Sequence, residues 1–399
     1  MDFTPSPRAE ELSARIRAFM DEHIYPDEAA IEAALDAEVD ADTPFPRVLV
    51  EIREKAKAAG LWNLFLPHSA DGPGLSNLEY GILNEEIGRC SVAAAYAFNC
   101  QPPDAGNMEI LVAHADAGQR ERWLVPLLEG EIRSCFSMTE PDTAGSDPTG
   151  MACRAVRDGD EWVIDGRKWW TTNALGAAVA IVMAVTDPEA PPHGRATMIL
   201  VPTDTPGFTL VRPLANMGHV AGPGHWEIAY ENCRVPVEAA TLGEVGGGFK
   251  VAQDRLGPGR IHHCMRLIGV AERALELMCE RAAGREMFGS KLSERQFVQD
   301  FIATSRAEID QARLLTLHAA WRLDEVGNRG ARKELSVTKL VVPAMALRVV
   351  DRAIQVFGGA GVSDDTPLSW MYRYNRMLRI GDGADEVHKQ VIARMELAG

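Results

Sequence analysis

Cys135-Phe-Ser-Met-Thr-Glu-Pro-Asp-Thr-Ala-Gly-Ser-Asp147 lies where the character of the chain changes. The residues before it carry apolar side chains at helical spacing, those after it alternate as strands do, and the far end is helical again. The stretch itself places hydroxyl side chains, a glycine and a proline in one short loop. Such a loop offers hydroxyl and backbone N–H donors to a flat or anionic ligand, although the same composition is also typical of an ordinary turn.

A second polar and aromatic cluster follows at Lys168-Trp-Trp-Thr-Thr-Asn173. If the two clusters lie on neighbouring strands, they can wall a planar cofactor. Tryptophan would stack on its face and threonine would hydrogen-bond its heteroatoms.

The composition is that of a soluble globular protein. Of its 399 residues 46% are apolar and 25% charged, which allows a large core and two or three domains. The net charge of −16 argues against nonspecific binding of nucleic acid. Seven scattered cysteines without CxxC pairing predict reduced thiols in a cytoplasmic protein. There is no signal peptide pattern and no apolar run long enough for a membrane span.

The periodicity predicts a helical region over 1–132, a compact β region over 133–245 and a helical bundle over 246–399. The helices expected in the first region cover 6–35, 48–60, 77–89, 92–98 and, as a pair, 104–130. The strands expected in the second cover 152–157, 161–164, 178–186, 197–201, 208–212 and 226–235. Four long helices with short joints, over 251–283, 293–327, 331–357 and 384–397, predict an antiparallel bundle.

One pair of potential metal ligands, His262-His263 beside Cys264, stands in the bundle region. Adjacent side chains on a helix point about 100° apart, and no second pair is spaced to complete a site. We therefore expect no metal.

Several separated motifs together resemble the acyl-CoA dehydrogenase family. Thr139-Glu-Pro, Gly145-Ser-Asp147 and Asp165-Gly-Arg-Lys-x-Trp-x-Thr-Asn173 resemble its flavin-contacting signature, in the same order. The order of helical, β and helical regions matches as well, so the resemblance spans nearly the whole chain. It implies a helical N-terminal domain, a β-barrel middle domain and a C-terminal four-helix bundle. The 139–147 stretch is one residue longer than the family pattern, and Met217-Gly lacks the arginine that usually follows.

The resemblance implies FAD, bound non-covalently. Arg285-Glu-Met-Phe-Gly289 is similar to the segment that reaches the FAD pyrophosphate, often from a neighbouring subunit, and arginine suits phosphate because its planar fork pairs with two oxygens. Gln355-Val-Phe-Gly-Gly-Ala-Gly361 is similar to the segment at adenine and ribose, although its glycines also suit a helix C-cap. The implied cofactor residues are Phe136, Met138, Thr139, Ser146, Trp170, Thr171, Thr172, Arg285, Phe288, Gln296, Gln355, Gly359 and Ala384.

The implied catalytic base is Asp382, in Arg379-Ile-Gly-Asp-Gly-Ala-Asp-Glu-Val-His388. Many family members read Tyr-Glu-Gly-Thr at this place, with glutamate as the base. On residue propensity alone, Asp382 is also a good turn or N-cap residue. Some relatives carry the base as a glutamate before Arg260, where this chain has Gly259. The aspartate pattern resembles the branch of acyl-CoA dehydrogenases found fused to phosphotransferase-like domains.

The activity that the resemblance implies is α,β-dehydrogenation of an acyl-CoA thioester, as in fatty acid β-oxidation. Asp382 would take the α-proton, flavin N5 would take the β-hydride, and an electron-transfer flavoprotein would accept the electrons. Ser146, Arg260 and Gly381 are the implied substrate residues, with Arg260 alternatively holding the base loop. The implied assembly is a homodimer or homotetramer. A flavin oxidase of the same fold, acyl-CoA oxidase or nitroalkane-oxidase-like, and a non-catalytic flavin-binding relative are the alternatives.

Overall fold

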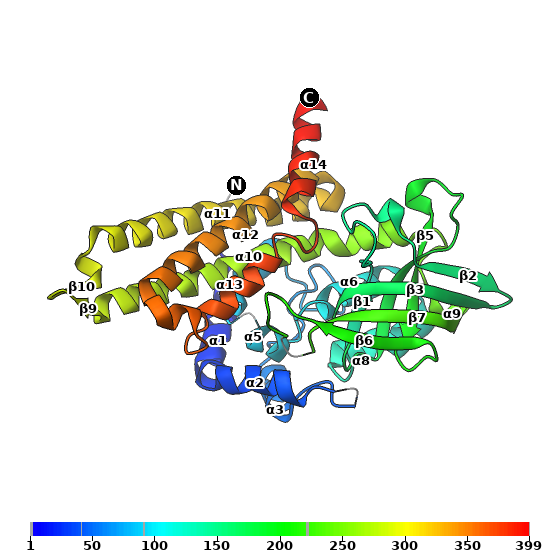
Figure 1. The fold of residues 1–399 in the computed structure, drawn as a ribbon, viewed down its shortest axis with the longest axis horizontal. Helices are drawn as coiled ribbons and strands as arrows, with labels where there is room; N and C mark the ends of the chain where they lie inside the picture. Colours follow the sequence, from blue (N-terminus) through cyan, green and yellow to red (C-terminus); the bar gives the residue numbers. More distant parts are fainter. Residues whose placement is uncertain (1–2, 41, 91, 221–222, 399) are drawn as a thin grey trace. The chain divides into compact units, whose positions relative to one another are not determined.

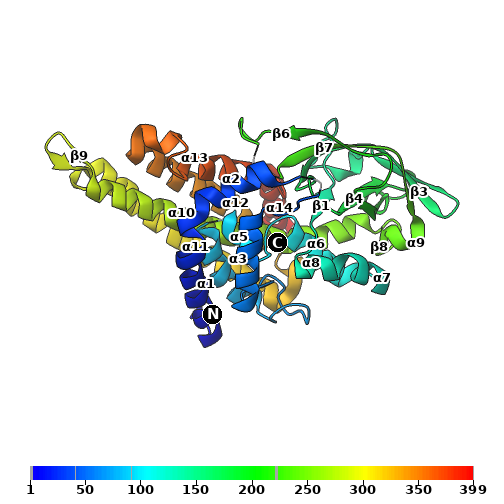
Figure 2. The ribbon, with the colours of Figure 1, turned by 90° about the horizontal axis from the view of Figure 1, so that it is seen from below.

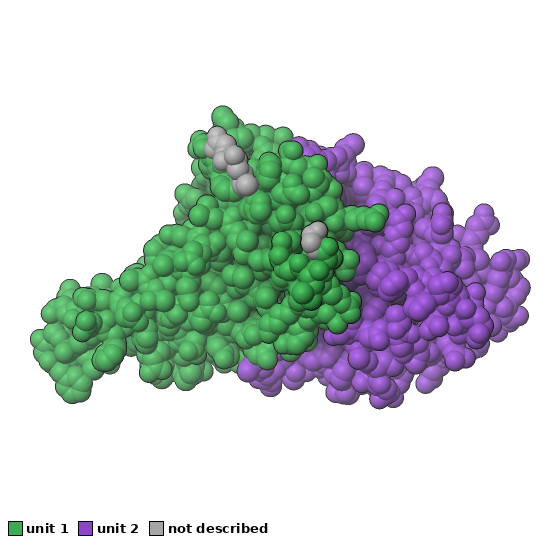
Figure 3. Space-filling view, turned by 90° about the horizontal axis from the view of Figure 1, so that it is seen from above, with its two compact units in different colours: residues 1–26, 75–95, 257–399 green, residues 27–74, 96–256 purple. Residues whose placement is uncertain are grey.

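The structure, a computed structural model of the 399-residue chain, describes every residue except 1–2, 41, 91, 221–222 and 399. The chain divides into two compact units, which Figure 3 shows in different colours. Unit 1 comprises residues 1–26, 75–95 and 257–399, and unit 2 comprises 27–74 and 96–256. Each unit therefore draws on both early and later parts of the sequence.

Unit 1 is helical (Figure 1). Its main helices are α1 (Pro7–His23), α4 (Asn77–Gly88), most of α10 (Gly248–Gly284), α11 (Gln296–Gly330), α12 (Arg332–Phe357), α13 (Leu368–Met377) and α14 (Asp385–Ala398). Leu267, Val270, Ala274 and Met278 recur on one face of α10 at spacings of three and four residues. That face is buried in the core of the unit. Polar side chains outside this face form ion pairs with neighbouring helices.

A β-hairpin joins α10 to α11. Its strands are β9 (Glu286–Met287) and β10 (Ser290–Lys291), and it forms the tip beyond these two helices (Figures 1 and 2). The two turn residues, Phe288 and Gly289, have φ values of 49° and 76°. Positive φ at both central residues is what a tight two-residue hairpin requires, and glycine at the second position adopts it without strain.

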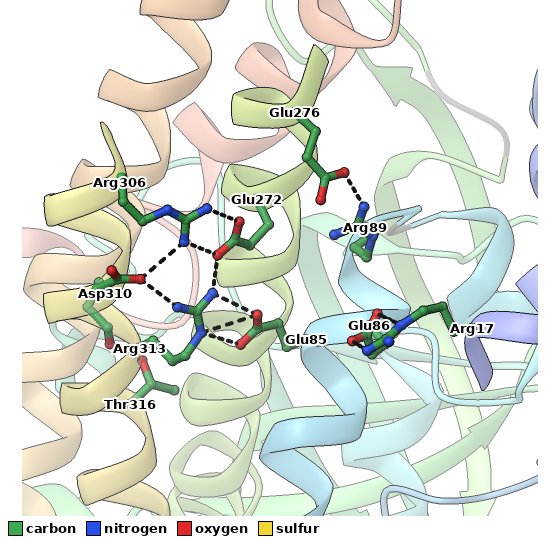
Figure 4. A network of polar contacts seen from close by, with 11 residues as sticks. Arg17, Glu85, Glu86, Arg89, Glu272, Glu276, Arg306, Asp310, Arg313 and Thr316 are labelled. Carbon is green, nitrogen blue, oxygen red and sulfur yellow. Dashed lines mark hydrogen bonds and ion pairs between the residues drawn. The ribbon is translucent and has the colours of Figure 1, made fainter. Parts of the chain in front are cut away.

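An ion-pair network ties α4, α10 and α11 together (Figure 4). Glu272 of α10 accepts from Arg306 at 2.7 Å and also pairs with Arg313, both on α11. Arg313 in turn pairs with Glu85 of α4 at 2.9 Å. Two arginines of α11 are thus shared by carboxylates of α10 and α4, and these charge-assisted bonds tie the three helices together.

Unit 2 carries the sheet. Its strands are β1 (Ser134–Ser137), β2 (Arg154–Asp158), β3 (Glu161–Thr172), β4 (Val179–Val185), β5 (Ala196–Pro202), β6 (Phe208–Leu214), β7 (His225–Pro236) and β8 (Thr241–Leu242). The strand order is β6-β7-β3-β2-β4-β5-β8, with β1 parallel to β4. Among the described residues no pair closes this path between β6 and β8, so the region is an open sheet domain. The unit also contains α2 (Glu28–Glu38), α3 (Arg47–Ala58), α6 (Asp104–His114), α7 (Ala117–Gln119), α8 (Val125–Glu129) and α9 (Val237–Ala240).

All six expected strands are present within a few residues of their expected ends, β3 being longer than expected. The single helix expected over 6–35 is wrong, because α1 ends at His23 and α2 begins at Glu28. Between them a short turn carries Pro26, and proline disfavours helix in the residue before it. The helix α13 was not expected, so the C-terminal region has one helix beyond the four predicted. Across the described residues, no helix is both long and apolar enough to cross a lipid bilayer.

Candidate functional site

A buried ion pair anchors the loop that follows β1. Lys168 of β3 donates from Nζ to the Glu140 carboxylate at 2.9 Å and to the Met138 carbonyl at 2.8 Å. The same carboxylate accepts the backbone N–H groups of Ala152 at 2.7 Å and Cys153 at 2.8 Å. Both charged side chains are at most 4% exposed. Glu140 therefore joins both ends of the loop to the sheet.

The electrostatics of Glu140 follow from these partners. Burial raises its pKa, but Lys168 and the two backbone N–H donors outweigh burial and hold the pKa below its usual value. The carboxylate thus stays ionised and neutralises the buried ammonium of Lys168. Breaking either side would leave an unpaired buried charge, which is costly.

The two polar and aromatic clusters of the sequence come together here. The Trp169 N–H donates to the Thr139 carbonyl at 2.9 Å, and the Ser137 and Thr171 hydroxyls lie 3.3 Å apart. These contacts connect β1 and the loop after it to β3. The two strands are not paired neighbours, because β1 pairs with β4.

Trp170 stands out on this surface. Its φ of 52° lies in the left-handed region, and the pairing of β3 with β7 is irregular between Lys168 and Thr171. The residue is 37% exposed, and the centroid of its ring lies 5.2 Å from that of the His225 ring. An irregular strand commonly re-aims a side chain, and here it turns an indole toward the surface.

The remaining cofactor candidates of unit 2 differ in exposure. Phe136, Met138, Thr139 and Thr172 are half-buried, and Ser146 is exposed. Thr171 is completely buried, with its hydroxyl 3.3 Å from that of Ser137. Half-exposed hydroxyls beside an exposed indole are a donor set that fits a flavin ring system.

The predicted base lies in a loop of unit 1 between α13 and α14. Asp382 adopts φ 57°, the left-handed region, and Gly383 follows with φ 108°. Arg260 of α10 donates from Nε to the Asp382 carbonyl at 2.8 Å. Lys339 of α12 donates from Nζ to the carbonyls of Leu378 at 2.6 Å and Gly381 at 2.9 Å. Strained backbone that is held at several points is common at functional sites.

The Asp382 side chain also has a partner on α10. His263 Nε2 lies 3.1 Å from Asp382 Oδ2, and the carboxylate is 23% exposed. A Cβ built on Gly259 would lie 3.8 Å from the same oxygen. A Cβ on Gly383 would lie only 2.8 Å from His388 Nε2, so this position requires glycine for space as well as for φ.

Buried basic groups surround the loop. Burial lowers the pKa of Lys339, while Cys264 and Asp382 oppose that shift. Burial, with Arg260 and Lys339 nearby, lowers the pKa of His388 to about 4, so this ring is neutral at physiological pH. The loop is therefore held by two basic side chains, Arg260 and Lys339, that bond its carbonyls.

The other predicted cofactor residues lie elsewhere in unit 1. Arg285 and Phe288 belong to the exposed hairpin, where Phe288 is 91% exposed, and Gln296 begins α11. Gln355 is exposed near the end of α12, and Gly359 follows that helix. Ala384 precedes α14, and its carbonyl accepts the N–H groups of residues 387 and 388.

Sequence reasoning missed three groups that the structure brings to these sites. They are the pair of Glu140 with Lys168, the Lys339 ammonium and the His263 imidazole. One signal was present for His263, because it stands one helical turn after Arg260 and side chains three apart share a face. Among the described residues no group of three or more potential ligands gathers to hold a metal.

Models of the three acyl-CoA dehydrogenase domains match the chain. The N-terminal domain model matches residues 6–131, the middle domain model 135–233 and the C-terminal domain model 246–397. The chain therefore belongs to the acyl-CoA dehydrogenase family. This membership confirms the predicted family and the predicted order of a helical, a sheet and a helical domain, although the sheet is open among the described residues and not the expected barrel.

Individual relatives agree. Acyl-CoA dehydrogenase family member 11 of Gallus gallus is 50% identical over 99% of this chain and 51% of its own length. FadE2 of Mycobacterium tuberculosis, named as a probable acyl-CoA dehydrogenase, is 50% identical over 100% of this chain and 97% of its own. A solved acyl-CoA dehydrogenase candidate from Mycobacterium abscessus has a TM-score of 0.94 at 49% identity, covering 99% of both chains. The chain thus spans about half the length of the Gallus gallus relative.

Proposed function

We propose that this chain catalyses the FAD-dependent α,β-dehydrogenation of an acyl-CoA thioester, with Asp382 as the base. Its family supports an oxidoreductase, and the FADH2 in a solved glutaryl-CoA dehydrogenase of the same fold supports FAD as the cofactor. The observation that carries the proposal is the base loop. There a single carboxylate lies between two glycines, in strained backbone, within the motif that resembles the family's Tyr-Glu-Gly-Thr segment.

Asp382 has the chemistry for the first step. A carboxylate oxygen accepts the α-proton of the thioester, and a base held within hydrogen-bond reach of that proton contributes about 10²–10⁴-fold to the rate. FAD, when bound, supplies the acceptor for the β-hydrogen. Arg260 fixes the carbonyl of the base residue through its Nε, so we assign it to holding the base loop. Gly381 and Ser146 remain the proposed substrate contacts.

The cofactor residues divide into two proposed groups. Phe136, Met138, Thr139 and the Trp170–Thr172 segment would contact the flavin ring, since they combine hydroxyls, backbone donors and an exposed indole. Arg285, Phe288, Gln296, Gln355, Gly359 and Ala384 would contact the rest of FAD, with Arg285 at the pyrophosphate. We infer that the hairpin reaches the FAD of a neighbouring subunit.

We also propose an assembly and an electron acceptor for this chain. The exposed Phe288 and Phe297, at 91% and 82%, supply the apolar surface that a homodimer or homotetramer would cover. We propose an electron-transfer flavoprotein as the acceptor, fatty acid β-oxidation as the process and the cytoplasm as the location. The domain limits 1–132, 133–245 and 246–399 are likewise proposed.

The test begins with the purified yellow protein. The released cofactor is identified by mass, and the protein is then titrated without oxygen against a panel of saturated acyl-CoA thioesters. We expect bleaching of the oxidised flavin band and one 2-enoyl-CoA per flavin. Absence of bleaching with every thioester would overturn the proposal. Rapid turnover with oxygen as sole acceptor would replace the dehydrogenase with a flavin oxidase.

A further inference from the structure

His263 occupies an unusual place between two charged groups. It lies on α10 with a side-chain exposure of 11%, and its Nε2 is 3.1 Å from Asp382 Oδ2. On the other side of the ring, Arg266 Nη2 is 3.1 Å from His263 Nδ1. Both contacts come from within unit 1, and together they engage both nitrogens of the imidazole.

These contacts fix the protonation of the ring. A guanidinium only donates hydrogen bonds, so His263 Nδ1 must accept and carries no proton. In the neutral ring the proton is then on Nε2, and this N–H donates a hydrogen bond to the Asp382 carboxylate. A doubly protonated ring would lose the Arg266 contact and place two cations together.

The electrostatics agree with a neutral ring. Burial lowers the pKa of His263, Asp382 opposes the shift, and Arg266 and Lys339 add to it. His263 is therefore suited to give a constant hydrogen bond, and poorly suited to store a proton during the reaction.

We propose that His263 is a positioning residue for Asp382, held as the Nε2–H tautomer by Arg266 and donating to Oδ2 to set the orientation of the carboxylate. This inference rests on the proposed function, in which Asp382 is the base. Arg260 holds the carbonyl of the same residue from one helical turn away, at 2.8 Å. Main chain and side chain of Asp382 are thus both held by α10.

The competing explanation is that the contact of His263 with Asp382 only stabilises the fold. The pH dependence of kcat/KM distinguishes the two explanations. A donor to Oδ2 favours the ionised carboxylate, so its loss should raise the pKa that governs the acid limb of kcat/KM. A structural tie would change stability without moving that limb.

Other ionisable groups near the loop must be accounted for. They come from α10 (Arg260, Cys264, Arg266), α12 (Lys339), α13 (Tyr374) and α14 (Asp385, His388). Burial raises the pKa of Cys264 to about 12 and that of Tyr374 above its usual value. Burial lowers the pKa of His388 to about 4. These three groups therefore hold one charge state over the neutral range.

The experiment compares two substitutions. His263→Leu removes the donor at similar volume, and His263→Gln keeps an N–H where Nε2 stood. We expect flavin reduction by acyl-CoA to slow by about 10²-fold in His263→Leu, with KM little changed, because small misplacement of a base costs about this much. The pKa of the acid limb of kcat/KM should rise in His263→Leu and stay unchanged in His263→Gln. Equal behaviour of the two variants, or an unmoved acid limb in His263→Leu, would overturn the proposal.

A second measurement needs no substrate. In protein labelled with ¹⁵N-histidine, the signal lost in His263→Gln identifies the ring, whose nitrogen shifts report the tautomer. We expect the neutral Nε2–H form across the neutral range. An Nδ1–H or doubly protonated ring would overturn the proposal. If wild type fails to react with acyl-CoA, the proposed function fails, and the spectrum still decides the tautomer.

Discussion

The carbonyl oxygen of Asp382 accepts a hydrogen bond from Arg260 Nε at 2.8 Å, across 122 residues of sequence. That bond ties the base loop to α10, and it holds a non-glycine residue at φ 57°. Left-handed backbone at such a residue costs on the order of 1–3 kcal/mol, so the surrounding contacts must outweigh it. The loop is thus preorganised by the helices of unit 1.

The alternative base position provides one prediction. A side chain at 259 would point toward Asp382 Oδ2, 3.8 Å from the Cβ position. We expect Asp382→Ala to lose activity and Asp382→Ala/Gly259→Glu to recover on the order of tenfold, since a carboxylate returns to the same region. Steady-state rates with an acyl-CoA measure this. Asp382→Ala/Gly259→Gln is the matched control, and equal recovery in that control would show that a base is not what was restored.

A second prediction concerns Lys168, which anchors the loop that follows β1. Lys168→Met leaves the Glu140 carboxylate buried without its cation, and removing one partner of a buried pair costs about 3 kcal/mol or more. Urea unfolding should show this loss, and the purified variant should retain less FAD. Lys250→Met, at an exposed lysine, should change stability by at most about 0.5 kcal/mol. An unaltered unfolding midpoint in Lys168→Met would contradict the assigned role.

The ion-pair network of unit 1 predicts a pH dependence. Burial raises the pKa of Glu272, but Arg306 and Arg313 outweigh it, so the folded pKa lies below the usual 4.5. A depressed folded pKa gives stability that is full above the unfolded pKa and is lost as pH falls through the folded one. Glu272→Gln should therefore cost about 2 kcal/mol at pH 7, and the difference from wild type should shrink in acid.

Unfolding curves at several pH values measure this difference. Glu280→Gln is the control, because Glu280 is exposed on the same helix. A wild-type-to-variant difference that stays constant down to the most acid pH would refute the linkage.

Much of the architecture could be predicted from the sequence, because it depends on local patterns. Alternating apolar residues and turn dipeptides located the strands, whereas the loop of Asp382 was singled out by its resemblance to a family motif and not by a local pattern. The rest depends on contacts that no local pattern encodes. Lys168 meets Glu140 only after the sheet has formed, and His263 meets Asp382 only after α10 has packed beside the loop. The helix α13 was missed because it is only ten residues long and partly polar.

Arg285 supplies a prediction about the cofactor. Hydrogen bonds between charged groups contribute about 1.5–3 kcal/mol, so Arg285→Gln should weaken FAD binding by roughly 10- to 100-fold. Titration of the FAD-free protein with FAD, followed by flavin fluorescence, measures the affinity. Arg329→Gln removes another exposed arginine of unit 1 and should leave the affinity within about twofold. Equal affinities of the two variants would remove Arg285 from the proposed site.

The most direct test of the account is the rate at which an acyl-CoA bleaches the flavin, without oxygen, in wild type and in Asp382→Asn. Asparagine keeps the shape of the side chain and cannot take the α-proton. We expect both proteins to hold the same amount of FAD, and reduction in the variant to be slower by at least about 10²-fold. Equal rates of bleaching in the two proteins would contradict Asp382 as the base.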